Sequence, residues 1–126
     1  MRTNQGTDWQ AGVMFSTSSN GTGAFAPANW VALSSDTNPP LATDTSLPGE
    51  ITTGTLTRVQ GSYAHTNGTN TATVTKTFTS DQAIAVNKMA LYTAGPTGGT
   101  MAFEDLLDRS DLQPGDAVTV SDVLAI

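Results

Sequence analysis

Threonine occupies every second position between residues 71 and 79, and the positions between them are Ala72, Val74, Lys76 and Phe78. An alternation with a period of two places each set of side chains on one side of a β-strand, whereas a helix would spread both sets around its surface. The sequence therefore predicts a strand with a threonine side and a mostly apolar side. A second apolar run over 84–92 follows a short polar linker, so we expect either a hairpin or a tight crossing between two strands. The side chains expected in the core are Val74, Phe78, Ile84, Val86 or Met89, and Leu91.

The composition indicates one turn-rich β domain. A chain of 126 residues has the usual size of one domain. It contains 22 threonines, 12 glycines and 6 prolines, and only 13% of its residues are charged. Threonine suits a pleated sheet, and glycine and proline suit turns. No apolar run approaches the roughly 20 residues that a membrane-spanning helix needs, and no signal pattern opens the chain, so we expect no membrane partner.

The order of strand and turn signals favours an antiparallel β-sandwich. Residues 1–7 are polar and are expected to form an N-terminal arm. A strand over 8–15 and a loop over 16–23 with the turn signal Asn20-Gly21 should follow. Further short strands are expected at 29–33, 50–51, 56–63, 71–79, 84–92, 100–104 and 117–126, a structured loop at 34–49, turns at 67–68, 94–99 and 113–116, and one short helix at 105–111. This series predicts a single jelly-roll-like or immunoglobulin-like sandwich over residues 8–126.

The charge and the absence of cysteine exclude several classes of function. The net charge is −6, with only five Lys and Arg residues against eleven Asp and Glu. Binding to phosphate groups needs a basic face, so no nucleic-acid partner is expected. Without cysteine the chain has no disulfide, no thiolate nucleophile and no cysteine-based metal site.

The remaining polar residues do not form a recognisable catalytic or metal-binding pattern. His65 is the only histidine, which excludes a two-histidine metal site, and we expect it in a solvated loop. The carboxylates of Asp36, Asp44 and Glu50 flank the 34–49 loop, but their spacing matches no known calcium loop. Turn or helix capping by the two aspartates is the better interpretation, with Glu50 meeting Arg58 or backbone amides.

An acidic run near the C-terminus allows two interpretations. A glycosidase carboxylate pair could be drawn from it, but a solvated helical face is favoured because nothing in the sequence separates two of these pKa values. The run consists of Glu104, Asp105, Asp108, Asp111 and Asp116. No nucleophile elbow or phosphate-binding glycine motif is present. The sequence therefore predicts no enzyme, no catalytic residue, no cofactor and no metal ligand.

Interaction with other chains is the function that these residues leave open. The threonine side is either a solvated sheet face with cross-strand hydroxyl contacts or a flat contact surface for another chain. Lys76, on the apolar side, could extend to the sheet edge or pair with an acidic residue of a neighbour. The candidate interface residues are Arg2, Trp9, Thr73, Thr75, Lys76 and Thr77.

Several short motifs, in this order, resemble those of small β-sandwich virion proteins of tailed bacteriophages. They are residues 30–34 (WVALS), 44–51 (DTSLPGEI), 56–58 (LTR), 75–79 (TKTFT), 87–92 (NKMALY), 98–101 (GGTM) and 115–120 (GDAVTV). The resemblance covers roughly residues 29–122. Relatives often have Gly-Leu-Phe where this chain has Ala90-Leu91-Tyr92. The motifs are packing and turn positions and carry over no catalytic residue.

The resemblance implies a structural role in a virion. The motifs resemble those of capsid decoration (cement) proteins as much as those of neck, tail or fibre components. We favour decoration because no fibre-shaft segment is present. The implied partners are the major capsid protein or other virion proteins. The resemblance also implies a homo-oligomer, and a trimer is the favoured form. The implied location is the capsid surface after assembly in the bacterial cytoplasm. A carbohydrate-binding module with Trp9, Trp30, Tyr63 or Tyr92 as a stacking platform is the alternative from another class.

Overall fold

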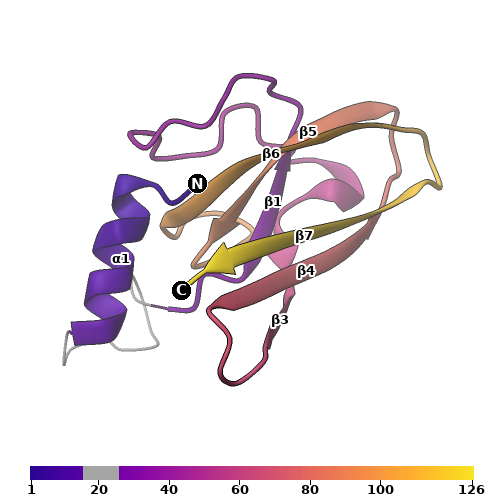
Figure 1. Ribbon diagram of the computed structural model, residues 1–126. Helices are drawn as coiled ribbons and strands as arrows, with labels where there is room; N and C mark the ends of the chain where they lie inside the picture. Colours follow the sequence, from indigo (N-terminus) through magenta and orange to yellow (C-terminus); the bar gives the residue numbers. More distant parts are fainter. Residues whose placement is uncertain (16–25) are drawn as a thin grey trace.

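The computed structural model describes residues 1–15 and 26–126, except for the side chain of Phe15. The predicted loop over 16–23, with its Asn20-Gly21 turn, lies outside the described residues. The elements are α1 (Asn4–Phe15), β1 (Trp30–Ser34), η2 (Gly54–Leu56), β2 (Val59–Gln60), β3 (Ser62–His65), β4 (Thr71–Thr79), β5 (Ile84–Tyr92), β6 (Met101–Leu112) and β7 (Ala117–Ala125), as Figure 1 shows. The strands predicted at 29–33, 71–79, 84–92, 100–104 and 117–126 are confirmed, as is the turn at 67–68, where Gly68 has a φ of 86°. The predictions at 50–51 and 56–63 are corrected: the first forms only an isolated bridge, and the second is divided among η2, β2 and β3.

Two antiparallel sheets form the body of the protein. The first has the strand order β2-β1-β5-β6 and the second has the order β3-β4-β7. The predicted all-β sandwich is therefore confirmed. The consecutive strands β4 and β5 belong to different sheets, so the linker between them crosses from one sheet to the other, and the hairpin alternative is wrong.

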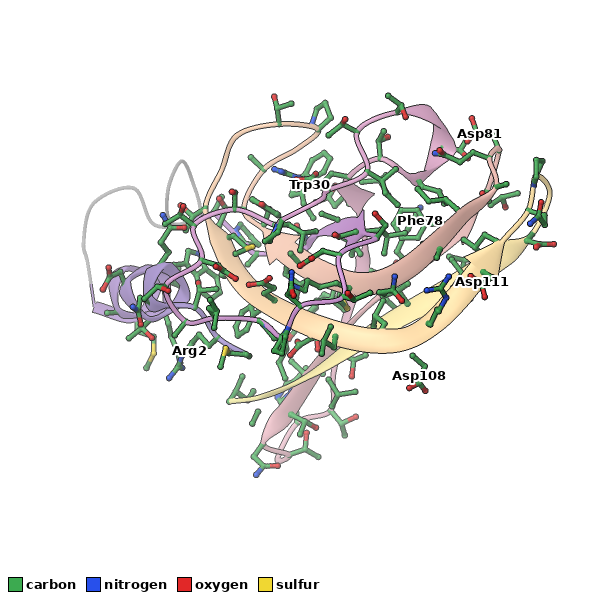
Figure 2. The ribbon with its side chains drawn as sticks, turned by 90° about the horizontal axis from the view of Figure 1, so that it is seen from above. Arg2, Trp30, Phe78, Asp81, Asp108 and Asp111 are labelled. Atoms are coloured by element: carbon green, nitrogen blue, oxygen red, sulfur yellow. The ribbon has the colours of Figure 1, made fainter. Side chains whose placement is uncertain are left out.

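The main core lies between the two sheets. β4 contributes Val74 and Phe78 from its apolar side, and β5 contributes Met89 and Leu91, as the alternation predicted. Figure 2 shows Phe78 between the strands of the two sheets. The other buried members are Val31, Leu33, Ile51, Leu56, Val86, Leu112 and Val120, with Ile84 half-buried at the margin.

A covering loop makes a third layer on the outer side of the four-stranded sheet. Strand β5 is buried from Val86 to Tyr92, including positions that face away from the main core. Residues 35–49 lie over this side, where Leu47 packs with Ala32, Ala90, Tyr92 and Met101. The backbone N–H of Leu47 donates a 2.8 Å hydrogen bond to the Tyr92 hydroxyl. Because both sides of β5 are covered, its residues are apolar apart from Asn87 and Lys88 and do not alternate with exposed polar ones.

The N-terminal region corrects two predictions. Residues 1–7 are not a free arm, and residues 8–15 are not a strand, because α1 spans Asn4–Phe15. Thr3 is fully buried and caps this helix, since its hydroxyl accepts the Gly6 N–H at 2.9 Å and donates to the Met101 carbonyl at 2.7 Å. Trp9 and Val13 are four residues apart, a spacing that places both on one face of a helix.

Helix α1 is fixed against the edge of β6. Arg2 forms an isolated antiparallel bridge with Phe103. The ring of Trp9 meets the ring of Phe103 edge to face, with centroids 6.1 Å apart. The backbone of Gly6 lies so close to Ala102 that an added Cβ would overlap the Ala102 carbonyl oxygen. Figure 1 shows α1 beside the sandwich, near the first residues of β6. No helix within the described ranges is long and apolar enough to cross a membrane.

The short helix predicted at 105–111 is also wrong. These residues belong to β6, which pairs with β5 from Leu112 opposite Ile84 to Met101 opposite Tyr92. Backbone pairing with β5 decides in favour of a strand over a helix. The charged residues of this segment are compatible with a helix, but they suit the exposed edge of a sheet equally well. Asp108 and Asp111 point away from the molecule in Figure 2.

Arg58 joins three loops around a buried aromatic ring. Its guanidinium donates to both Glu50 carboxylate oxygens, at 3.1 and 2.8 Å, which confirms the predicted Glu50–Arg58 pair. It also donates to the carbonyls of Ala94 at 3.0 Å and Gly98 at 2.6 Å, and it lies 3.5 Å from the centroid of the Tyr92 ring. Four hydrogen bonds and one ring contact thus converge on a side chain that is 6% exposed.

Replacement of Gly6 by alanine should destabilise the fold by roughly 1–3 kcal/mol, because the new methyl group forces α1 away from β6. Urea denaturation of the variant measures the change. Asp8→Ala, at an exposed position of the same helix, is the control and should leave stability nearly unchanged. A Gly6→Ala protein as stable as the parent would contradict the close packing of α1 on β6.

Replacement of Arg58 by lysine should cost on the order of 2–4 kcal/mol, because an ammonium cannot reproduce the paired contact with Glu50 and the carbonyl bonds together. The matched control is Arg109→Lys, since Arg109 forms an ion pair with Asp111 at the surface, with side chains 61% and 71% exposed. The control should change stability by less than about 0.5 kcal/mol. Equal effects of the two substitutions in thermal denaturation would contradict the role given to Arg58.

Candidate interaction face

The outer side of the three-stranded sheet carries no charged residue. Thr71, Thr73, Thr75, Thr77 and Thr79 alternate with core-facing residues along β4. The register places Ser62 and Ala64 of β3 beside them on one side, and Ala117, Thr119, Ser121, Val123 and Ala125 of β7 on the other. All of these residues are exposed or half-buried. We call this surface the neutral face.

Hydroxyl groups of the neutral face are paired across the strands. Thr75 and Ser121 lie 3.0 Å apart through their hydroxyl oxygens, and Thr77 and Thr119 lie 2.9 Å apart. Val123, which is 64% exposed, adds apolar area to the same surface. The predicted cross-strand hydroxyl contacts are therefore confirmed. Small side chains on three paired strands give a surface without protruding charged groups.

The six candidate interface residues do not form one surface. Thr73, Thr75 and Thr77 lie on the neutral face. Lys76 lies on the opposite side of β4, opposite Val120 and beside a hollow of about 490 Å³ that Asp81 and Thr55 also line. Strand β3 pairs with β4 only from Ala72 to Thr75, so at Lys76 that side of β4 has no strand partner, and the extension of Lys76 to the sheet edge stays a prediction.

Arg2 and Trp9 lie elsewhere, at the contact of α1 with β6. The guanidinium of Arg2 donates to the side-chain carbonyl of Gln10. The Trp9 indole N–H donates to the Ala26 carbonyl at 2.8 Å. Both side chains therefore take part in holding α1 in place, and this contact is not continuous in the sheet with the neutral face.

The aromatic residues do not make a stacking platform. Tyr92 is buried beneath Arg58, and Trp30 packs on the second core cluster beside Gly95. Trp9 meets Phe103, whereas Tyr63, which is 67% exposed, lies on β3 of the other sheet. Among the side chains that the structure describes, a carbohydrate ring would find one open tyrosine and no row of aromatic rings.

The loop carboxylates and the histidine have separate local partners. Asp44 accepts the Leu41 N–H at 3.2 Å, which is the capping contact expected of it, whereas Asp36 pairs mainly with Lys88. His65 ends strand β3 instead of lying in a loop, and its Nδ1 is 2.8 Å from the Thr71 carbonyl oxygen. Over residues 1–15 and 26–126, no three acidic or histidine side chains converge in a way that could hold a metal ion.

A buried ionic cluster lies beneath the covering loop, and the sequence did not predict it. The Lys88 ammonium donates to Asp36 Oδ2 at 2.7 Å and to Glu104 Oε1 at 3.0 Å. Lys88 and Glu104 have no exposed surface, so Glu104 does not belong to a solvated acidic face. The lone lysine within the apolar run of β5 was the available signal, because a buried lysine requires a buried acidic partner.

Burial and hydrogen bonding shift the pKa values of the three side chains of this ionic cluster. The hydrogen bond from Lys88 lowers the pKa of Asp36. Burial raises the pKa of Glu104, and the nearby Asp44 carboxyl raises it further. Burial alone would lower the pKa of Lys88, but its hydrogen bonds with Asp36 and Glu104 outweigh this and raise it. Glu104 Oε2 has no hydrogen-bond partner.

A second carboxyl pair lies between β6 and β7. Burial raises the pKa of Asp122 to about 7, and the neighbouring Asp105 carboxyl contributes to the same direction. Asp105 also pairs with the amine of Met1. Asp122 therefore retains its proton in the fold at a pH at which an ordinary aspartate has lost it.

Comparison with models of known protein families finds no match, and comparison with curated proteins finds none either.

The raised pKa of Asp122 predicts a specific dependence of stability on pH. Between its ordinary pKa of 3.8 and about 7, the folded protein binds more protons at this site than the unfolded chain. The contribution of Asp122 to the free energy of unfolding therefore falls as pH rises through this window and is constant above it. Asp122→Asn should match the parent at pH 4 and exceed its stability by on the order of 2 kcal/mol at pH 8.

Denaturant unfolding at both pH values measures this difference, with Asp108→Asn at an exposed site of β6 as the control. A difference between Asp122→Asn and the parent that does not change with pH would contradict the assignment.

Proposed function

We propose that this chain is a non-enzymatic virion structural protein of a tailed bacteriophage, and specifically a capsid decoration protein that acts as a homo-oligomer. The motifs over residues 29–122 suggest the class of protein. The neutral face is the observation that carries the mode of action. It is a surface over three strands without a charged side chain, in a chain with eleven acidic and five basic residues.

Electrostatics favours a second copy of the same chain as the partner of the neutral face. Each copy has a net charge of −6, so two copies repel one another wherever their acidic surfaces meet. Contact through the neutral face keeps the charged groups at the periphery, where water and salt screen them. A strongly basic partner would instead gain most from contact with the acidic edges, such as the exposed part of β6.

The hydroxyl pairs reduce the cost of covering this face. A hydroxyl that loses water without a new partner is destabilising by about 1–3 kcal/mol. Thr75 with Ser121 and Thr77 with Thr119 already satisfy one another across the strands. These pairs lower the cost of burial for four of the eight hydroxyl groups of the neutral face, and Val123 supplies apolar area.

The proposed action is mechanical. An oligomer seated over neighbouring capsid subunits adds contact area that exists only in the assembled shell, and binding to the assembled state stabilises that state by mass action. Residues 1–7 are not the attachment arm in this proposal. Thr3 is fully buried and caps α1, so deletion of the segment would damage the fold itself.

Thr75→Glu should dissociate the oligomer, because it places a carboxylate at the centre of the neutral face in each copy. Sedimentation velocity of the parent protein should give an oligomer, and the variant should sediment as a monomer. Thr97→Glu adds the same charge to an exposed turn between β5 and β6 and should leave the oligomer intact. A monomeric parent protein at high concentration, or an oligomeric Thr75→Glu variant, would contradict the proposed contact.

Copy number tests the location in the particle. Quantitative mass spectrometry of purified virions should find this chain in numbers comparable with the major capsid protein. A low number that matches a ring at the neck or tail would replace decoration by the accessory role.

A further inference from the structure

Three side chains with complementary chemistry meet in the ionic cluster beneath the covering loop. Lys88 comes from the middle of β5, Glu104 from β6, and Asp36 from the loop directly after β1. The Lys88 nitrogen lies 2.7 Å from one oxygen of Asp36 and 3.0 Å from one oxygen of Glu104. Lys88 is thus a potential nucleophile in contact with two carboxyls. Asp36 can serve as the acyl group, and Glu104 can carry protons.

The surroundings hold this cluster together and exclude water from Lys88 and Glu104. The side chain of Lys88 is 1% exposed, that of Glu104 is not exposed, and that of Asp36 is 16% exposed. In the pairing of the sheet, Glu104 lies opposite Ala90 and Ala90 lies opposite Ala32, so small side chains leave room for the longer ones under the loop. The covering loop is held in turn by the hydrogen bond from Leu47 to Tyr92.

We propose that Lys88 and Asp36 condense to an intramolecular isopeptide bond, with Glu104 as the proton relay. The Lys88 nitrogen, as the free amine, attacks Cγ of Asp36, a nitrogen–carbon bond forms, and one carboxyl oxygen of Asp36 leaves as water. Counted from the ammonium and the carboxylate, one proton stays on the amide nitrogen and two leave with the oxygen. The reaction needs no oxidant, reductant or activated co-substrate.

Glu104 is suited to the relay by its position. Its Oε1 already accepts a hydrogen bond from the nitrogen that must lose protons, and its Oε2 has no partner. Burial raises the pKa of this carboxyl, so that it can hold a proton and return it to the departing oxygen. The raised pKa of Lys88 and the lowered pKa of Asp36 make the ion pair the resting form, and transfer of a proton from the ammonium within the cluster forms the less populated, reactive pair of amine and carboxylic acid.

Asp36 is a better acyl group than Glu104 for two reasons. Its oxygen is closer to the Lys88 nitrogen, at 2.7 Å against 3.0 Å. Asp36 is also the member of the cluster that reaches the surface, which gives the released water a way out. A fixed contact between the reacting groups removes the entropy cost of a bimolecular encounter, which lowers the barrier to condensation.

The consequence is a covalent tie between the loop after β1 and the centre of β5. It would close the chain between residues 36 and 88 and reduce the conformational freedom of the unfolded chain, as a disulfide does in other proteins. This inference does not depend on the proposed role in the virion, because it concerns only contacts within one chain.

Intact-mass spectrometry of the purified full-length protein tests the bond directly. The parent chain should be lighter than its sequence mass by one water molecule, and peptide mapping should find the segment around Asp36 joined to that around Lys88. Lys88→Met and Asp36→Ala should have their full sequence masses. Lys76→Arg, which changes a lysine outside the cluster, is the matched control and should keep the deficit of one water.

Two further variants keep the test informative if those proteins fold poorly. Glu104→Gln retains both reacting groups and should have its full mass although it folds. Asp36→Asn should form the same bond with loss of ammonia and so reach the same final mass as the parent. A parent protein that keeps its full sequence mass after prolonged incubation would overturn the proposal. A complete mass deficit in Glu104→Gln, or a crosslink mapped to Glu104, would overturn the roles assigned to the two carboxyls.

Discussion

The fully buried ammonium of Lys88 is the constraint on which the arrangement of the layers depends. A buried charge without partners costs several kilocalories per mole, so the fold must bring acidic groups to it. Asp36 arrives from the loop after β1 and Glu104 from β6. These contacts fix where the covering loop crosses the four-stranded sheet, and they make one side of β5 a buried interior in place of a solvated face.

Arg58 serves the same purpose at Tyr92, the last residue of β5. It joins Glu50 and the carbonyls of Ala94 and Gly98 around the ring of Tyr92. The buried ionic contacts of this fold therefore hold loops against the four-stranded sheet. The neutral face of β3, β4 and β7 is different, because it has neither charge nor covering layer, and it is the surface through which we propose that copies meet.

The sequence predicted best the parts of the fold that depend on local pattern. The alternation along β4, the core positions Val74 and Phe78 and the turn at Gly68 needed no knowledge of distant residues. The failures, at α1 and at 105–111, were decided by tertiary contacts. Thr3 caps α1 through its contact with Gly6 and the backbone of Met101, and β6 becomes a strand because β5 offers it a partner edge. The lone lysine in the apolar run of β5 indicates a buried acidic partner, but Asp36 and Glu104 lie far from it in the chain, so no spacing in the sequence identifies them as its partners.

A cryo-electron microscopy reconstruction of the virion that contains this chain is the most direct test of the central claim. The account predicts density for the sandwich at many equivalent positions on the outside of the capsid shell, with the neutral face of each copy covered by another copy. Density confined to a ring at the neck or tail, or copies on the shell whose neutral faces are open to solvent, would contradict it.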